Sequence, residues 1–398
     1  MKKIIFRSKN LSWILSLLIV SGLASCRKDN SLGFTPGTGA PTITSVHTLS
    51  KTDTAARTTT VTTYDTSGNI STTVGSAPEL ITAFDSVTTT GNLQQYYVIV
   101  GTNLGSTTTI TFNGVSAYFN RALISDKSLI VSIPITVPTL GPAATNKLVV
   151  TTLHGSVTYK FTVLPPPPTI LEYSTNDFTA GSEITLTGQG FAAVTSVTLK
   201  TTSDAATIVT QSDTILVLKM PKSAATESPL LLSYTSGATT AMVTSSTLFN
   251  DLDNAYVVFT DDYGTGWFSN SWGPGAPSTA QAKTGTSSFA ATYPKGNYWA
   301  DGFGSNTGLP TSGYTYLSFW IKGGIETYTL YLTADTRPGG FGNSDQSFPI
   351  NVPANVWTYF KLPLSTLSLS GSKHFGLWIA GPADQDETFY LDDVVLLK

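Results

Sequence analysis

The chain has 398 residues and a formal net charge of −3, with 12% charged and 40% hydrophobic residues. This length predicts about two to four domains, and the apolar content is sufficient for packed cores, which excludes a disordered chain. Three histidines and one cysteine exclude a Cys/His zinc cluster and an intrachain disulfide. The absence of a basic tract argues against nucleic acid as a partner. Abundant Thr, Ser and Gly favour strands and turns, so we expect an all-β, multidomain chain.

The first 25 residues have the layout of an export signal. Four basic residues within the first nine precede an apolar run over 13–20, which is too short to remain as a membrane-spanning helix. The following Leu-Ala-Ser-Cys over 23–26 resembles the lipobox of bacterial lipoproteins. This resemblance implies that Cys26, the only cysteine, is diacylated and becomes the mature N-terminus, leaving a net charge of −7. The alternative is a generic secretory leader in which the cysteine is incidental.

Residues 27–40 have the composition of a flexible tether, rich in Gly, Ser, Thr and Pro. Within them, Arg-Lys-Asp-Asn over 27–30 resembles the signal that directs lipoproteins of Bacteroidota to the cell surface. Two or more acyl chains give stable anchoring where a single chain is marginal. We therefore expect an outer-membrane lipoprotein that faces the extracellular side, with residues 26–40 as its tether.

The middle of the chain contains an internal repeat. The run over 98–104 matches the run over 185–191 at a constant offset of 87 residues, with Gly101 over Gly188. Each copy opens with Pro-Thr-Ile, at Pro41 and at Pro168, and contains an alternating apolar run that ends at a proline. Alternation of this kind between Gly, Pro and Asn turns predicts short antiparallel strands, and a repeat of about 90 residues is the size of an immunoglobulin-like sandwich.

These motifs, together with the Thr-Phe-Asn-Gly run over 111–114, resemble the IPT/TIG family across residues 41–249. The resemblance implies two tandem immunoglobulin-like domains, which we place at 41–164 and 165–249. In the first, an insertion over 48–77 contains two strand-like segments around Asp-Thr-Ser-Gly at 65–68, which predicts a hairpin. The four prolines at 165–168 predict a stiff spacer between the two domains. For 41–249 we expect a scaffold role, and a tight turn explains Asn113-Gly114.

Residues 250–398 differ in composition, since they hold six of the seven tryptophans. We expect about eight strands in this segment, a number that fits a jelly-roll sandwich. The clearest candidates are 257–259, 316–321, 327–332, 357–362, 376–379 and 389–396. The runs Leu-Ser-Phe-Trp-Ile-Lys-Gly-Gly (317–324) and Tyr-Leu-Asp-Asp-Val (390–394) resemble the carbohydrate-binding jelly-roll superfamily.

The order of lipobox, IPT/TIG-type domains and terminal jelly roll resembles the surface glycan-binding proteins of Bacteroidota polysaccharide-utilisation systems. The xyloglucan-binding members are most similar, through the segment that runs from Thr260 to Gly273 here. The resemblance implies a non-catalytic lipoprotein that captures a plant-type glycan (xyloglucan or another β-glucan or hemicellulose) for uptake. It also implies a TonB-dependent transporter and its lipoprotein lid as partners. We expect a monomer that needs no cofactor.

Aromatic rings are the natural ligands of a sugar, because an indole accepts the apolar C–H face of a pyranose while nearby polar groups fix its orientation. Trp267 and Trp272 lie in a Gly/Ser/Asn-rich stretch, and Tyr298 and Trp299 in another, so we predict that these rings bind glycan. Arg337, Asn343 and Asp301 are the candidate polar contacts. We expect the remaining three tryptophans of this segment to pack in the core: Trp320, Trp357 and Trp378.

Three alternatives remain open from the residues alone. A glycosidase would need two carboxylates at a defined separation, and only two glutamates follow residue 249. A protein-binding adhesin would also suit tandem sandwiches on a lipid anchor, but it should present a flat or edge-strand interface rather than open aromatic rings. A structural calcium ion held by Asp251, Asp253, Asp392 and Asp393 is an option that we do not predict.

Overall fold

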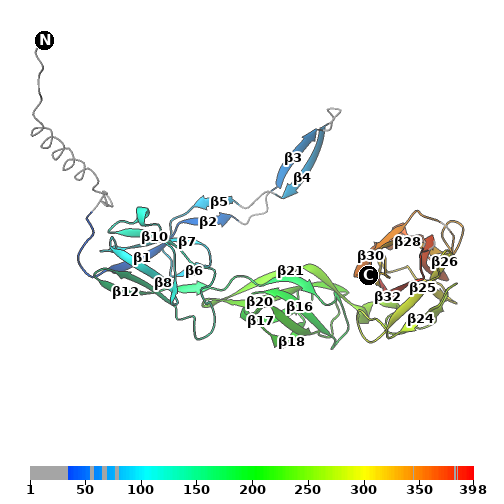
Figure 1. The fold of residues 1–398 in the computed structure, drawn as a ribbon. Coiled ribbons are helices and arrows are strands. Elements are labelled where there is room, and N and C mark those ends of the chain that lie inside the picture. The colour runs from blue at the N-terminus through cyan, green and yellow to red at the C-terminus, as the bar shows by residue number, and fades with distance from the viewer. Residues whose placement is uncertain are drawn as a thin grey trace, which may run out of the picture. The chain divides into compact units, whose positions relative to one another are not determined.

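The computed structural model describes residues 35–53, 58–64, 70–76, 80–343, 345–380, 382 and 384–398 (Figure 1). Within these residues every regular element is a β-strand or a short 3₁₀ turn, which confirms the all-β prediction. The described residues include no helix that is long and apolar enough to cross a membrane. Cys26 lies outside them, so its lipidation stays a prediction. The chain divides into two compact units, Met1–Pro165 and Pro166–Lys398.

The first unit is an immunoglobulin-like sandwich of two sheets, with strand orders β1-β7-β10 and β12-β11-β8-β9. Side chains from both sheets, such as Ile99 and Phe112, fill one buried core. Asn113 and Gly114 both have positive φ and connect β8 to β9, as expected for the tight turn predicted there. The elements outside the insertion are β1 (Thr42–Thr48), β6 (Thr90–Asn92), β7 (Tyr96–Thr102), β8 (Thr107–Phe112), β9 (Val115–Ser116), η1 (Arg121–Leu123), β10 (Ser128–Ser132), β11 (Lys147–Thr152), β12 (Gly155–Lys160) and β13 (Thr162–Leu164).

The insertion in this unit contains the predicted hairpin. β3 (Thr58–Tyr64) pairs with β4 (Ile70–Ser76) in antiparallel register, with Thr58 opposite Ser76 and Tyr64 opposite Ile70. β2 (Ser50–Asp53), which precedes the hairpin, forms a second antiparallel pair with β5 (Leu80–Ala83), which follows it. The insertion is therefore two strand pairs in series between β1 and β6.

The second sandwich begins the other unit and repeats the first at the predicted offset. β16 (Glu183–Gln189), β17 (Val194–Leu199) and β19 (Ile215–Lys219) lie 87 residues after β7, β8 and β10, with identical lengths. Both repeats need glycine at the same position. A Cβ at Gly101 would lie within 2 Å of the carbonyl oxygen of Thr42, and one at Gly188 within 2 Å of that of Thr169. The remaining elements are β14 (Thr169–Tyr173), β15 (Asp177–Phe178), η2 (Phe191–Ala193), β18 (Ala205–Gln211), β20 (Glu227–Ser236), β21 (Thr239–Asp251) and η3 (Leu252–Asn254).

The C-terminal domain is a sandwich of a six-stranded sheet, β24-β25-β32-β27-β30 with β22 beside β32, and a five-stranded sheet, β23-β26-β31-β28-β29. All six strands expected from the sequence are present. The glycine-rich stretch that contains Tyr298 and Trp299 is part of a strand, because β26 begins at Tyr298. The elements are β22 (Tyr256–Phe259), β23 (Trp267–Ser269), β24 (Gly275–Ser278), β25 (Ser288–Tyr293), β26 (Tyr298–Ser305), β27 (Tyr316–Lys322), β28 (Tyr328–Ala334), β29 (Pro349–Val352), β30 (Trp357–Pro363), η4 (Leu364–Thr366), β31 (His374–Ala380) and β32 (Glu387–Leu397).

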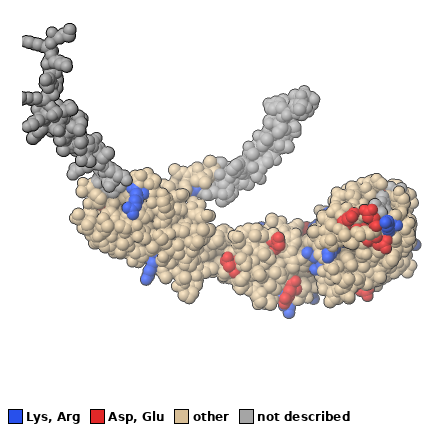
Figure 2. Space-filling view, in the orientation of Figure 1, with Lys and Arg blue, Asp and Glu red and all other residues tan. Residues whose placement is uncertain are grey.

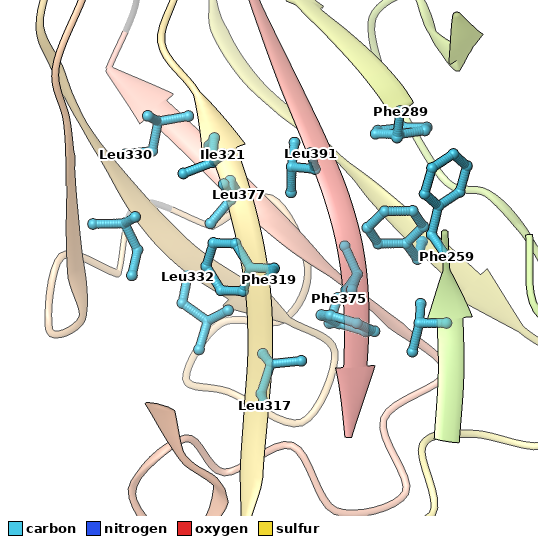
Figure 3. Close-up of a cluster of buried hydrophobic side chains, with 14 of the residues drawn as sticks. Phe259, Phe289, Leu317, Phe319, Ile321, Leu330, Leu332, Phe375, Leu377 and Leu391 are labelled. Carbon is cyan, nitrogen blue, oxygen red and sulfur yellow. The ribbon is translucent and has the colours of Figure 1, made fainter. Parts of the chain in front are cut away.

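One apolar core lies between these two sheets, and Figure 3 shows part of it. Alternate residues of each strand point inward, so Leu317, Phe319 and Ile321 of β27 meet Phe375 and Leu377 of β31. The other residues of these strands face away from the core. The domain therefore has two outer faces, one on each sheet, and the aromatic residues outside the core lie on them.

Candidate functional site

The outer face of the five-stranded sheet is defined by the alternation along β26. Phe303 belongs to the core and Trp299 packs against it, so Tyr298, Ala300 and Gly302 face the other way. The chain after β23 continues beside this strand, since Asn270 N donates to Gly302 O and Trp272 N donates to Ala300 O, each at 2.9 Å. Trp272 therefore points to the same outer face as Tyr298.

Strand register extends this face into a row of large side chains. Ala300 is opposite Trp378 on β31, and Trp378 is opposite Tyr331 on β28. Trp272, Ala300, Trp378 and Tyr331 thus follow one another across the segment after β23 and the three neighbouring strands β26, β31 and β28. Because strands lie about 4.8 Å apart, the row spans roughly 14 Å of backbone. It is long enough to contact several units of an extended ligand.

Tyr298 and Trp272 on this outer face are open to solvent. Tyr298 is 69% exposed and Trp272 is 51% exposed. Tyr298 stacks on Trp378, with ring centroids 6.0 Å apart and planes at 19°, and Tyr331 contacts the same indole at 5.6 Å. Trp378 is only 1% exposed as a result, although it lies outside the core between the sheets. The buried indole supports the exposed tyrosine from below.

Two of the predicted aromatic contacts are wrong. Trp267 is 5% exposed, packs edge-on against Phe375 and donates its indole N–H to the hydroxyl of Tyr256 at 3.0 Å. Trp299 is half-buried and packs against the core from the inner side of β26. Glycine-rich neighbours indicate an accessible backbone, but the parity of the strand decides which face receives the ring.

Arg337 was expected at the rim of the surface, and this prediction is also wrong. Its guanidinium is buried and donates to Leu367 O at 2.8 Å, to Asp345 Oδ2 at 2.8 Å and to Ser347 Oγ at 2.7 Å. These acceptors belong to the chain that follows β28 and β30. Arg337 therefore organises a loop and does not present its donors to solvent.

Asp301 is not a rim residue either, because it lies on the inner side of β26 and is 2% exposed. Its Oδ1 accepts from Gly273 N at 2.9 Å, and its Oδ2 is buried with no partner among the described residues. Burial raises the pKa of Asp301 to about 6, against the opposing hydrogen bonds from Gly273, Ser271 and Trp272. The carboxyl thus holds the segment that carries Trp272 from below.

Asn343 is the one predicted polar residue that is exposed, in the loop after β28. The same loop brings Phe341 to the outer face, where its ring centroid lies 6.1 Å from that of Trp272 at an interplanar angle of 81°. Sequence analysis missed Phe341, Tyr331 and Trp378 as residues of this face. The alternation over 375–379 could have placed Trp378 on this face, because Phe375, Leu377 and Ile379 face the core.

The described surface is sparsely charged. Figure 2 shows few Lys, Arg, Asp or Glu side chains on its visible face, apart from a group of acidic side chains on the C-terminal domain. The described residues contain no group of three or more His, Cys, Asp or Glu side chains that could hold a metal ion. The four aspartates considered for calcium do not form such a group. Asp251 accepts from Asp253 N, whereas Asp392 accepts from the backbone of Lys283 and Thr284.

The second sandwich matches a known domain family. Residues 168–250 match the family model described as the IPT/TIG domain. A curated protein of Bacteroides ovatus described as an IPT/TIG domain-containing protein is 32% identical to this chain over 120 residues. That match covers 29% of this chain and 24% of the relative, so the chain spans about a quarter of the length of that protein.

Solved structures that match this chain include a surface glycan-binding protein from Prevotella bryantii. It has 17% identity and a TM-score of 0.47 and covers 91% of this chain and 99% of its own. A surface glycan-binding protein from a complex xyloglucan utilisation locus in Bacteroides uniformis has 18% identity and a TM-score of 0.37. The match covers 77% of this chain and 96% of that protein's chain. The ligands in these names belong to those proteins.

The IPT/TIG domain covers the outer face of the other sheet, within the same compact unit. Trp320 on β27 donates its indole N–H to Asp177 Oδ2 at 2.7 Å, and Asn250 donates to the hydroxyl of Tyr359 at 2.8 Å. The ammonium of Lys283 lies 4.0 Å above the Trp320 ring. Trp320 is 5% exposed, and burial raises the pKa of Asp177 to about 6. The prediction that Trp320 packs in the core is wrong: the ring is buried on the outer face, between Lys283 and Tyr359 of its own domain and Asp177 of the second sandwich.

Proposed function

We propose that this chain is a non-catalytic polysaccharide-binding protein whose binding surface is the outer face of the five-stranded sheet. The observation that carries the proposal is the row Trp272, Ala300, Trp378 and Tyr331 with the open ring of Tyr298 stacked above it. Tyr298 and Trp272 keep more than half of their surface exposed, although Phe341 packs edge-on against Trp272.

The chemistry of this face suits a sugar chain. Tyr298 presents one ring face to solvent while Trp378 supports the other, so the ring is oriented before a ligand arrives. A pyranose can place its C–H face on such a ring and keep its hydroxyls in water or against polar neighbours. A fixed ring loses little conformational freedom on binding, which favours affinity. The two open rings, Tyr298 and Trp272, allow contacts that are individually weak to add up.

The ligand that we propose is a neutral plant-type glycan, such as xyloglucan or another β-glucan or hemicellulose. The guanidinium of Arg337 is buried and donates to Leu367, Asp345 and Ser347, so it does not face solvent to pair with an acidic sugar. The chain itself carries a net negative charge, which disfavours an anionic polysaccharide. A glycan is also the ligand class in the names of the structurally similar proteins.

Capture without bond cleavage is part of the proposal. Hydrolysis of a glycosidic bond needs two carboxyl groups that flank the bond. The carboxyl of Asp301 is buried on the inner side of β26, so it does not face a ligand that lies on Tyr298.

The test is affinity electrophoresis of the full chain against a panel of neutral and acidic polysaccharides, followed by titration calorimetry with the best ligand. Tyr298→Ala should weaken binding by at least 10-fold, because burial of an aromatic side chain contributes about 1.5–3 kcal/mol. The matched control is Tyr118→Ala, since Tyr118 is 78% exposed but lies in the first unit. Equal affinities of these two variants would contradict the proposed surface, and release of new reducing ends would contradict the non-catalytic role.

We also propose that Cys26 carries the lipid that holds the chain at the outer membrane, with the IPT/TIG-type domains as a stalk. Uptake would follow by transfer of the glycan to a TonB-dependent transporter with a lipoprotein lid. Metabolic labelling with a tagged fatty acid tests the anchor, because Cys26→Ala should abolish both the label and membrane retention. Labelling that survives this substitution would contradict the assignment.

A further inference from the structure

The loop between β28 and β29 reaches over the outer face and is built around glycines. Gly339, Gly340 and Gly342 have φ values of 80°, 82° and 79°, a region that L side chains rarely adopt. Gly342 N donates to Thr333 Oγ1 at 2.8 Å, and Thr333 lies opposite Gly376 on the same sheet. The loop is therefore tied to the middle of the face that carries the aromatic row.

Gly342 lies directly against the ring of Trp272. A Cβ added at Gly342 would be 2.0 Å from Cη2 and 2.1 Å from Cζ2 of that indole. Any side chain at this position must therefore push the ring away. The backbone of Trp272 is fixed separately by its hydrogen bond to Ala300 O, so the ring cannot retreat by moving its whole segment without breaking that bond.

The base of the loop is clamped from below by Arg337. Its guanidinium donates to Asp345 and Ser347 near the end of this loop and to Leu367 in the segment after β30. Hydrogen bonds from Ser347, together with the Arg337 guanidinium, hold the pKa of Asp345 below its usual range. The clamp therefore stays ionised at neutral pH and the loop keeps its place over Thr333.

We infer that Gly342 is the positioning residue of the binding surface, because its bare α-carbon sets the plane of the Trp272 ring and so determines which glycans fit the aromatic row. This inference rests on the proposed function. Gly342 acts through Trp272 and does not need to touch the ligand. Van der Waals contact between a ring and a sugar falls off within an ångström, so the displacement that relieves a Cβ-to-ring separation of only 2.0 Å removes most of that contact.

The experiment compares Gly342→Ala with Gly340→Ala in the full chain. Both glycines have nearly the same positive φ, so both substitutions carry a similar backbone cost. A Cβ at Gly340 would meet nothing within 4 Å, which makes this variant the matched control. We expect Gly342→Ala to weaken glycan binding by at least 10-fold, and Gly340→Ala to change it by less than about twofold. Equal affinities for the two variants would overturn the inference.

Fluorine NMR of protein labelled with 5-fluorotryptophan provides a readout that does not need a glycan. The Trp272 resonance is assigned by its absence from Trp272→Phe. Gly342→Ala should shift this resonance and leave the others in place, whereas Gly340→Ala should shift none. An unmoved Trp272 resonance in Gly342→Ala would contradict the positioning role, whether or not a polysaccharide binds. Failure of every polysaccharide in the panel to bind would count against the proposed function only.

A double-mutant cycle separates a positioning effect from general damage to the loop. Phenylalanine is too short to reach Gly342 from position 272, so Gly342→Ala in a Trp272→Phe background should cost less than about twofold in affinity. A loss as large as in the parent background would mean that the added methyl group acts on the loop itself and would contradict the inference. This cycle also covers the case in which Gly342→Ala alone folds poorly, because the double variant removes the overlap.

Discussion

The two outer faces of the C-terminal sandwich carry similar residues but differ in what covers them. The six-stranded sheet presents Trp320 and Tyr359 to the IPT/TIG domain, where both take part in hydrogen bonds with buried polar side chains. The five-stranded sheet presents Trp378 and Tyr331 in the same cross-strand manner, but there Trp378 stacks with the exposed ring of Tyr298, and the loop after β28 crosses the same face.

This difference shows that an outward aromatic residue has two roles in one fold. Where a neighbouring domain covers it, the residue stabilises a domain junction, and its polar atom has a protein partner. Where the sheet is left uncovered, the aromatic residues form layers, with a buried indole below and an open ring above. The second arrangement exposes apolar surface at a cost to solubility, which is typical of a binding site.

Loss of the covered aromatic residue should have the largest effect on stability. Trp320→Ala removes the ring under Lys283 and leaves the carboxyl of Asp177 without its indole donor. We expect the free energy of unfolding of the unit Pro166–Lys398 to fall by about 3–5 kcal/mol. Denaturant unfolding monitors this, with Trp272→Ala on the open face as the comparison. Similar losses for both variants would remove the distinction between the two faces.

A conservative change at the same position should have a smaller effect. Trp320→Phe retains most of the apolar contact but removes the donor to Asp177 Oδ2, so we expect a loss of about 1–3 kcal/mol. Trp272→Phe, at an exposed ring, should change stability by less than about 0.5 kcal/mol. A neutral Trp320→Phe would show that the hydrogen bond to Asp177 contributes nothing to the junction.

The smallest expected effect is a pH dependence of stability. Burial raises the folded-state pKa of Asp301 to about 6, above the unfolded value near 3.8. The folded state therefore binds this proton more tightly, and the contribution of Asp301 to stability is lost as pH rises through about 6. Asp301→Asn mimics the protonated carboxyl, and it should raise the melting temperature by roughly 2–4 °C at pH 8 relative to wild type but not at pH 4.

The control for this measurement is Asp213→Asn, at an exposed aspartate of the same unit. Its melting temperature should follow wild type at both pH values. If the melting temperature of Asp301→Asn equals that of wild type at both pH 4 and pH 8, the fold does not raise the pKa of this carboxyl.

Much of the fold could be predicted from the sequence because its signals are local. The alternating runs gave the six strands of the terminal sandwich, and the offset between Gly101 and Gly188 gave the repeated strands of the two immunoglobulin-like domains. Glycine at these two positions is required by the close approach of the opening strand, so the motif reports a backbone contact directly.

The exposed aromatic face could be predicted only in part, because exposure depends on strand register and on which face a second element covers. Tyr298 and Trp272 are exposed as the sequence indicates, but Trp299 has the same glycine-rich neighbours and lies on the opposite side of β26. Arg337 lies in a polar loop, and its burial depends on contacts with Leu367 and Ser347 that no local pattern shows. Trp378 required the parity of β31 and the knowledge that Tyr298 and Tyr331 cover it.

The most direct test of the account is calorimetric titration of the Trp272→Ala/Tyr298→Ala double variant with the polysaccharide that wild type binds best. Both rings are exposed, so the melting temperature should remain that of wild type while the binding heat disappears. A double variant that folds normally and retains wild-type affinity would contradict the central claim that this open aromatic face holds the glycan.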